Sequence, residues 1–310
     1  MKKMFITGGN GNLGRLLADR MLTHGIEVIR FDLPGSFVGD PTDGQIIEFG
    51  DVRDTELLQQ LFSKHQPDSV CHLASLLSGS SESDLQISWE INATASFQLL
   101  QLSMQHKVDR FLFASTIATY GDVSENPMSE DYPQWPHSMY GATKVAVERL
   151  GHYFKVKHGL DFRCLRFPLV ISPFAPKTAV SAYPSHALLA AAKGESFVFP
   201  VSADTGISTM FLGDVIDSME QFLLADSSCN RRPVYNVDSY YMTAQMAADA
   251  ITAAFPDFTY SFEPVANVDA LIAGWPDRVD NSPAQQDWGW QASCDLDGSI
   301  RGILKMIENG

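Results

Sequence analysis

The alternation of short apolar runs with amphipathic stretches through the first 170 residues constrains the fold of this chain more than any other feature. The apolar runs predict strands at residues 3–7, 27–32, 69–73, 110–114 and 161–167. Apolar residues at helical spacing predict helices at residues 13–24, 55–64, 89–106 and 139–158. Strands that alternate with helices in this way form parallel sheets with helices on both faces. We therefore expect an α/β fold around a parallel sheet.

Glycines 8, 11 and 14 follow the first predicted strand and run into the start of the first predicted helix in the pattern G-x-x-G-x-x-G. In such a unit the first glycine permits a tight turn, the second lets a pyrophosphate approach the backbone, and the third lets the helix pack closely on the sheet. The free N–H groups at the start of the helix carry positive partial charge toward the phosphates. The pattern predicts a Rossmann-type, doubly wound dinucleotide-binding fold, with cofactor contacts from Gly8, Asn10, Gly11, Asn12, Leu13 and Gly14.

A carboxylate stands at the end of the second predicted strand. This residue, Asp32, follows Gly14 by 18 positions. A carboxylate there can accept hydrogen bonds from both ribose hydroxyls of the adenosine, and it repels a 2′-phosphate. The next residue is Leu33, and no arginine directly follows. Asp32 and Leu33 therefore predict NAD rather than NADP as the cofactor, and the alternative is that Asp32 only caps a loop.

A candidate general base lies on the predicted helix 139–158. Tyr140 and Lys144 are four residues apart, so they share a face of that helix. The pKa of a free tyrosine is about 10, too high for a base at neutral pH. A nearby ammonium, together with the positive ring of an oxidised nicotinamide, stabilises the phenolate, which can then accept a proton. The alternative is a surface lysine beside a half-buried tyrosine.

Two hydroxyl residues, Ser115 and Thr116, follow the predicted strand 110–114. They lie at the carboxyl end of a parallel strand, where open α/β sheets bind ligands. Thr116 precedes Tyr140 by 24 residues. With the glycine loop and the YxxxK pair, this set resembles the extended short-chain dehydrogenase/reductase family of NAD-dependent epimerase/dehydratase-like enzymes. The resemblance covers nearly the whole chain. It implies that Thr116, Tyr140, Lys144 and Ser115 are catalytic and that Ser115 contacts the substrate. It does not decide which of Ser115 and Thr116 holds the substrate hydroxyl.

The same resemblance implies further contacts to the cofactor. The segment 50–54 resembles the part of the family beside the adenine, and the segment 71–75 resembles the strand that passes under the ribose. An asparagine stands where the family keeps one in its fourth helix, and the segment 165–170 resembles the part that touches the nicotinamide. The implied contacts are Asp51, Val52, Leu73, Ala74, Ser75, Asn92, Tyr140, Lys144, Phe167 and Leu169, with Lys144 on the nicotinamide ribose.

Longer strings are more specific than the cofactor motifs. Residues 72–78, 256–258, 272–284 and 287–290 resemble the short-chain-type L-threonine 3-dehydrogenases. This resemblance implies oxidation of the β-hydroxyl of L-threonine to 2-amino-3-ketobutyrate, a step of threonine catabolism, by hydride transfer to NAD with Tyr140 as the base. The implied substrate contacts are Ser78, Ser115, Thr116, Tyr140 and Trp275.

One segment departs from those dehydrogenases, which carry a glycine-rich GGGTTDYA-like stretch after the sixth strand. Here residues 176–184 read PKTAVSAYP. Thr178 or Ser181 can supply the hydroxyl contact that is lost. The change also leaves open a different 3-hydroxy acid or amino acid as the substrate.

Two other functions compete with this interpretation. A sugar-nucleotide epimerase or dehydratase holds a diphosphate, usually with arginine forks. Residues 167–215 contain no arginine, although Arg231, Arg232 or Arg278 could replace it. The other alternative is a non-catalytic NAD-binding regulator, and the intact set of Thr116, Tyr140 and Lys144 argues against it.

The βα pattern weakens after residue 168, where prolines 173, 176 and 184 interrupt it, and it returns near residues 210–224 and 234–237. We expect an NAD-binding Rossmann domain of residues 1–168 plus about 209–238. We expect a smaller, discontinuous α/β substrate-binding lobe of about 169–208 plus 239–310.

The formal net charge of −15 argues against nucleic-acid binding. No apolar run approaches the ~20 residues that span a bilayer. The four cysteines are far apart, which predicts reduced thiols and no metal site. We expect a cytoplasmic protein with a small-molecule substrate, an amino acid or hydroxy acid, and with no nucleic-acid or membrane partner. The sequence does not decide between a monomer and a homodimer.

Overall fold

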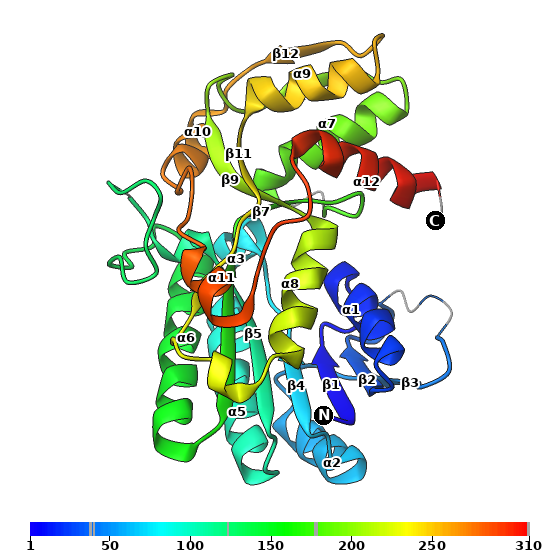
Figure 1. Ribbon diagram of the computed structural model, residues 1–310, viewed down its shortest axis with the longest axis vertical. Helices are drawn as coiled ribbons and strands as arrows, with labels where there is room; N and C mark the ends of the chain where they lie inside the picture. The colour runs from blue at the N-terminus through cyan, green and yellow to red at the C-terminus, as the bar shows by residue number, and fades with distance from the viewer. Residues whose placement is uncertain (37–38, 40, 123, 177–178, 309–310) are drawn as a thin grey trace. The chain divides into compact units, whose positions relative to one another are not determined.

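The computed structural model describes residues 1–36, 39, 41–122, 124–176 and 179–308. The chain forms two compact units, and each is made from separate pieces of sequence (Figure 1). Unit 1 contains Met1–Thr119, His137–Arg166 and Ile216–Tyr235. Unit 2 contains Tyr120–Pro136, Phe167–Val215 and Asn236–Gly310. The domain division expected from the sequence stays a prediction.

Unit 1 is built on a sheet with the strand order β10-β6-β5-β4-β1-β2-β3. Strand β1 pairs in parallel with β2 on one side, where Phe5 faces Ile29, and with β4 on the other, where Phe5 faces Val70. The chain order reverses at β1, which places a ligand-binding crevice at the carboxyl ends of β1 and β4. The strands are β1 (Lys3–Thr7), β2 (Glu27–Asp32), β3 (Gln45–Phe49), β4 (Ser69–His72), β5 (Arg110–Thr116), β6 (Asp161–Phe167) and β10 (Tyr235–Asn236).

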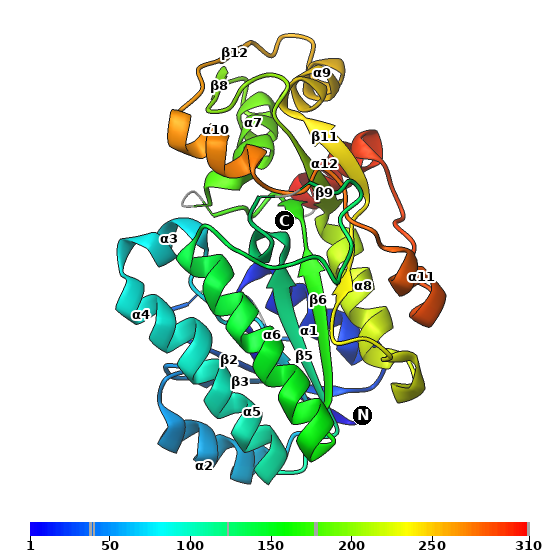
Figure 2. The same cartoon turned by 90° about the vertical axis from the view of Figure 1, so that its left-hand side faces the viewer.

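Helices cover both faces of this sheet, as Figure 2 shows. Helices α2 (Thr55–His65), α5 (Ala95–Gln105) and α6 (Met139–His158) lie on one face, preceded along the chain by α3 (Ser78–Ser83) and α4 (Leu85–Trp89). Helices α1 (Asn12–Thr23) and α8 (Leu212–Leu224) lie on the other. Arg20 of α1 joins these two helices through ion pairs to Asp217, at 2.9 Å, and to Glu220.

The core of unit 1 is aromatic and aliphatic. Rings from the strands stack on one another, such as Phe5 on Phe31 at 5.6 Å and Phe111 on Phe162 at 5.9 Å between centroids. Leucines of α2 and α5 pack against them and are buried. Burial of this apolar surface is the main free-energy term that favours the sheet and its covering helices. The α/β, Rossmann-type doubly wound fold expected from the sequence is confirmed.

Several predicted elements match the structure residue for residue. These are the strands 3–7, 27–32 and 161–167 and the helix 139–158. The helix predicted at 89–106 is confirmed in its extent, because residues 85–105 are helical throughout, but its internal geometry differs: α4 ends at Trp89, a π-helical turn follows over Glu90–Thr94, and α5 begins at Ala95. The extra residue of a π turn does not disturb the apolar spacing enough to be seen in the sequence.

Unit 2 contains two small sheets and several helices. Strand β9 pairs in parallel with β7 and antiparallel with β11, and β8 pairs in parallel with β12. The strands are β7 (Leu169–Ile171), β8 (Phe197–Phe199), β9 (Gly206–Phe211), β11 (Tyr240–Thr243) and β12 (Tyr260–Phe262). The helices are α7 (Tyr183–Ala192), α9 (Ala244–Ala254), α10 (Ala266–Ala273), α11 (Ser282–Trp288) and α12 (Leu296–Glu308). Within the described ranges, no helix is long and apolar enough to cross a membrane.

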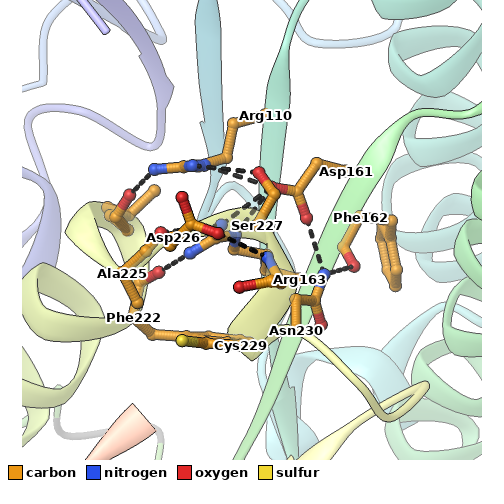
Figure 3. A network of polar contacts seen from close by, with 12 residues as sticks. Arg110, Asp161, Phe162, Arg163, Phe222, Ala225, Asp226, Ser227, Cys229 and Asn230 are labelled. Atoms are coloured by element: carbon orange, nitrogen blue, oxygen red, sulfur yellow. Dashed lines mark hydrogen bonds and ion pairs between the residues drawn. The ribbon is translucent and has the colours of Figure 1, made fainter. Parts of the chain in front are cut away.

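A buried polar network in unit 1 ties the start of β6 to the chain beyond it (Figure 3). The Asp161 carboxylate accepts hydrogen bonds from Arg163 at 2.8 Å, Ser227 at 2.8 Å and Asn230 at 2.6 Å. Arg110 of β5 also pairs with it, at 3.3 Å. The Arg163 side chain has no exposed surface, so its charge depends on this carboxylate.

The same two arginines cap the C-terminal end of α8. Arg163 donates to the carbonyls of Phe222 and, at 3.0 Å, Ala225, and Arg110 donates to the carbonyl of Leu223. The last carbonyls of a helix lack partners within it and carry partial negative charge. The network therefore anchors the end of α8 to the sheet.

Burial opposes ionisation of Asp161, but hydrogen bonds from Arg163 and Asn230 outweigh it and hold the pKa of this carboxyl below its usual range. A carboxylate with a depressed pKa stabilises the fold above its unfolded pKa of about 4, and this stability is lost as the pH falls through the folded value.

We predict that Asp161→Ala lowers the free energy of unfolding at pH 7 by about 3–5 kcal/mol, because it leaves the buried Arg163 without its counterion. Urea denaturation measures this loss, which should shrink below about pH 4. The exposed pair Lys3–Glu27 gives the control, since Glu27→Gln should cost less than about 1 kcal/mol. Equal losses from both substitutions contradict the assigned role.

Candidate active site

The loop between β1 and α1 has almost no room for side chains. A Cβ atom at Gly8, whose φ is +66°, lies 2.8 Å from the backbone nitrogen of Ala74. A Cβ atom at Gly14 lies 2.4 Å from the Gly8 carbonyl oxygen. The first glycine thus allows close approach to the segment after β4, and the third allows α1 to pack against the loop.

The start of α1 fits a phosphate. Among the residues that the structure describes, a Cβ atom at Gly11 meets only the Gly8 carbonyl oxygen, at 3.2 Å, so the side of Gly11 away from Gly8 is open. Gly11 is also the N-cap residue and has no side chain with which to bond the first amides of the helix. Backbone amides at a helix start attract anions through their N–H groups and the helix dipole. The open cradle at Gly11 therefore fits the pyrophosphate of a dinucleotide.

The carboxylate of Asp32 lies beside this loop. Its Oδ2 atom accepts from the backbone N–H of Asn10 at 2.9 Å, and its Oδ1 atom accepts from that of Leu33 at 2.8 Å. Each oxygen has a further lone pair for a hydroxyl. The buried Arg30 also holds the loop: it donates to the Gly9 carbonyl at 2.9 Å and to the Asn10 side chain at 2.7 Å. The sequence analysis did not predict this role. The sequence signal that could have indicated it is a basic residue in the otherwise apolar middle of β2, two places before the end of the strand.

The segment after β4 is held by a buried chain of hydrogen bonds. His72 Nδ1 lies 2.6 Å from the Thr7 hydroxyl, and His72 Nε2 lies 2.7 Å from the Ser96 hydroxyl. Burial, followed by the charge of Lys144, lowers the pKa of His72 to about 3, so the imidazole is neutral. The Thr7 hydroxyl also accepts from the backbone of Ala74, at 3.3 Å. This chain sets the backbone of the predicted ribose contacts, Leu73, Ala74 and Ser75.

The remaining predicted cofactor residues of unit 1 differ in what they contact. Asp51 pairs with Arg53 at 2.6 Å, and that hydrogen bond lowers the pKa of the carboxyl, while the neighbouring Val52 is buried. Asn92 lies in the π turn and is also buried. Its amide bonds both backbone groups of Leu76, at 2.8 and 3.0 Å. Asn92 therefore shapes the loop that leads to Ser78, which begins α3 and is buried.

The candidate base lies in the first turn of α6. The Ser138 hydroxyl caps this helix by accepting from Gly141 N–H at 3.1 Å, and Tyr140 is the second residue. Lys144, one turn later, is buried and donates to the Ala114 carbonyl at 2.9 Å. Its Nζ atom lies 5.4 Å from the centre of the Tyr140 ring and 4.7 Å from that of Phe113. The structure thus brings the predicted phenol and ammonium together.

The two hydroxyl residues at the end of β5 have different environments. Ser115 is 3% exposed, and its hydroxyl donates to the carboxylate of Glu148 at 2.5 Å. Thr116 is partly exposed, and its hydroxyl oxygen accepts from the backbone of Ala118 at 3.2 Å, which leaves its proton for another acceptor. Successive residues of a strand point to opposite faces. This arrangement makes Thr116 the accessible hydroxyl of the two.

The electrostatics of the pair include a cost that the sequence analysis left out. Burial raises the pKa of Tyr140 above its usual value. Burial also lowers the pKa of Lys144 to about 8, against the opposing effects of Cys164 and Glu148. Without an additional positive charge nearby, the phenol is therefore protonated at neutral pH.

The other predicted residues belong to unit 2. Phe167 and Leu169 are buried, and Leu169 pairs with Thr209 of β9. Ser181 is partly exposed in a 3-10 turn, and Trp275 is 9% exposed after α10. Thr178 lies outside the described residues. Among the residues that the structure covers, no group of three or more His, Cys, Asp or Glu side chains is placed to hold a metal.

Comparison with known proteins identifies the family. Residues 4–238 match the NAD dependent epimerase/dehydratase family. The chain therefore belongs to this family, and its recognition as an extended short-chain dehydrogenase/reductase is confirmed.

Relatives match over nearly the whole length of this chain. An uncharacterised epimerase/dehydratase of Staphylococcus saprophyticus is 29% identical over 99% of this chain and 98% of its own length. The mitochondrial L-threonine 3-dehydrogenase of Bos taurus is 29% identical over 98% of this chain and 82% of its own. Among solved structures, the L-threonine dehydrogenase of Clostridium difficile superimposes with a TM-score of 0.92 at 28% identity, covering 100% of this chain and 98% of that one. The protein is an NAD-dependent oxidoreductase similar to the L-threonine 3-dehydrogenases.

We predict that Gly14→Ala weakens NAD binding by at least ~tenfold, because its methyl group lies 2.4 Å from the Gly8 oxygen and the loop must shift. A fluorescence titration with NAD measures the affinity. Gly25→Asn is the control, since Gly25 has a φ of +71°, which asparagine tolerates, and no atom lies within 4 Å of its Cβ position. Unchanged affinity in Gly14→Ala contradicts the cradle.

Proposed function

We propose that this protein oxidises the β-hydroxyl of L-threonine to 2-amino-3-ketobutyrate by hydride transfer to NAD, as a step of threonine catabolism in the cytoplasm. One observation carries the proposal. L-Threonine dehydrogenases superimpose on 99–100% of this chain with TM-scores of 0.91–0.92, and this span includes the parts of unit 2 that supply the predicted substrate contacts.

The predicted catalytic residues supply the proton chemistry. Tyr140 takes the proton of the substrate hydroxyl as general base, and Thr116 holds that hydroxyl through its accessible side chain. Lys144 lies one turn from Tyr140 and places positive charge beside the phenol. The start of α6 acts in the same direction, because a helix N-terminus stabilises an anion in its first turn.

NAD⁺, when bound, supplies the hydride acceptor and a further positive charge near the phenol. Gly8, Gly11 and Gly14 form its phosphate cradle, with Asn10, Asn12 and Leu13 in the same loop. Asp32 binds the ribose hydroxyls, and its charge disfavours a 2′-phosphate. We assign the adenine side to Asp51 and Val52, the ribose side to Leu73, Ala74 and Ser75, and the nicotinamide side to Phe167 and Leu169.

The substrate's remaining atoms are assigned to Ser78 of unit 1 and to residues of a substrate-binding lobe, about 169–208 plus 239–310. In that lobe Ser181 and Trp275 are the described candidates, and Thr178 is a further one. The altered segment 176–184 is where a different small 3-hydroxy acid would be selected.

The rival function is the conversion of sugar nucleotides. The UDP-glucose 4-epimerase of Thermotoga maritima has a TM-score of 0.87 at 22% identity, a likeness in fold alone. Two observations oppose this rival: residues 167–215 contain no arginine to bind a diphosphate, and Arg278 pairs with the buried Asp238 at 2.9 Å.

We predict that L-threonine gives NADH with the purified protein and that UDP-glucose and UDP-galactose are not converted. The panel also contains L-allo-threonine, L-serine and 3-hydroxybutyrate, each followed at the NADH absorbance band with NAD and with NADP. Activity with NADP that equals that with NAD contradicts the role of Asp32. Turnover of a UDP-sugar, or of 3-hydroxybutyrate in preference to L-threonine, overturns the proposed substrate.

We predict that Tyr140→Phe lowers kcat by at least ~1,000-fold while the affinity for NAD stays within ~threefold, since only the proton acceptor is removed. Stopped-flow NADH formation and a binding titration measure the two quantities. Tyr153→Phe is the matched control, because Tyr153 lies on the same helix and is 50% exposed. Full activity in Tyr140→Phe excludes this residue as the base.

A further inference from the structure

A third ionisable group continues the line formed by the candidate base and its lysine. Tyr140, Lys144 and Glu148 follow one another at intervals of four residues on α6 and therefore lie along one face of the helix. Glu148 is 3% exposed, as is Lys144. A buried carboxylate is costly unless it is paired, so its position needs an explanation.

Glu148 joins three elements of unit 1. Its two oxygens accept a bidentate pair of hydrogen bonds from Arg166 of β6, from Nε at 2.9 Å and from Nη2 at 2.7 Å. Its Oε1 atom also accepts from the Ser115 hydroxyl at the end of β5, at 2.5 Å. The carboxylate thus links the catalytic helix to the ends of the two neighbouring strands.

The link to Ser115 has a consequence for its neighbour. Ser115 directly precedes Thr116, so its hydrogen bond to Glu148 restrains β5 next to the predicted catalytic threonine. Because side chains alternate along a strand, the face turned away from Glu148 belongs to Thr116. The Ala114 carbonyl, which accepts from Lys144, lies in the same stretch. Glu148 is therefore bonded to the same short stretch of β5 that carries Thr116 and the carbonyl partner of Lys144.

We propose that Glu148 is a positioning residue for the Tyr140–Lys144 pair: its carboxylate holds the end of β5 through Ser115 and supplies the negative charge that keeps Lys144 in its ammonium form. This rests on the proposed function in one respect, namely that Lys144 assists the base.

Among the described residues, the other groups near Lys144 do not supply that charge. The Phe113 ring and the Ala114 carbonyl are uncharged, and His72 is neutral because burial lowers its pKa to about 3. Burial and the charge of Glu148 raise the pKa of the Cys164 thiol well above its usual range, so the thiol is protonated when Lys144 titrates.

Removing the negative charge should therefore have a measurable effect on Lys144. Burial lowers the pKa of this lysine to about 8, and charges on Cys164 and Glu148 would oppose that decrease. Because the Cys164 thiol keeps its proton, Glu148 is the one of the two that carries charge when Lys144 titrates. Without Glu148, the charges of Lys144 and Arg166 remain together in the interior, and the lysine can lose its proton to relieve their repulsion.

The test compares Glu148→Gln, which removes the charge at constant size, with Glu148→Asp, which keeps it. The protein is labelled with ¹³C at lysine Cε and titrated by NMR without cofactor or substrate, and Lys144→Met identifies the signal. We expect the midpoint of Lys144 to fall by at least ~1 pH unit in Glu148→Gln and to move by less than ~0.3 unit in Glu148→Asp. If Glu148 has a purely structural role, the titration midpoint of Lys144 will be the same in the two variants.

Kinetics provide the second readout. Loss of the ammonium should move the alkaline limb of the kcat/KM profile to lower pH by a similar amount in Glu148→Gln. A uniform loss of activity at every pH, with the midpoint of Lys144 unmoved, overturns the proposal. The NMR titration needs no turnover, so it remains decisive if L-threonine is not the substrate.

Glu148→Gln leaves Arg166 without its counterion, so the same comparison is made in a chain carrying Arg166→Gln. There the midpoint of Lys144 in Arg166→Gln is compared with that in the double variant Glu148→Gln/Arg166→Gln. The proposal requires the double variant to titrate at the lower pH, and equal midpoints contradict it.

Discussion

The close approach of the β1–α1 loop to the carboxyl end of β4 is the constraint on which the cofactor side of unit 1 depends. At Gly8 there is no room for a Cβ atom beside the backbone of Ala74. At Gly14 there is no room for a Cβ atom between α1 and the loop. A side chain at either position would meet backbone atoms closer than 3 Å, so the loop, α1 or the segment after β4 would have to shift. The buried Arg30 and the hydrogen-bonded chain through His72 hold the loop and its neighbour in this geometry.

The part of unit 1 that holds the proposed catalytic residues is organised by a different principle, the pairing of buried charge. Lys144 is placed in the interior by α6, and a lysine in that position resists ionisation. Glu148 one turn later lowers this cost, and Arg166 in turn compensates Glu148. At the opposite ends of the strands, Asp161 compensates the buried Arg163 in the same way. At both ends of β6 a buried arginine is thus paired with a carboxylate, Arg163 with Asp161 and Arg166 with Glu148.

Much of the fold could be predicted from local pattern. The first two strands, α6 and β6 match their predicted bounds because apolar spacing, the Ser138 cap and Gly159 mark them within a few residues of sequence. The π turn that contains Asn92 could not be predicted in this way. Its buried amide bonds the distant backbone of Leu76, and such a contact leaves no periodic signal.

The sequence by itself determined the family, the glycine cradle, the acidic residue at the end of β2 and the pairing of Tyr140 with Lys144, since each depends on neighbours within one loop, one strand or one helical turn. Tertiary structure alone decided which hydroxyl at the end of β5 is accessible, because Ser115 is held by a carboxylate 33 residues away in the chain. It also decided how far burial shifts the pKa values of Tyr140 and Lys144. Desolvation depends on every element packed around a group, which no spacing in the sequence records.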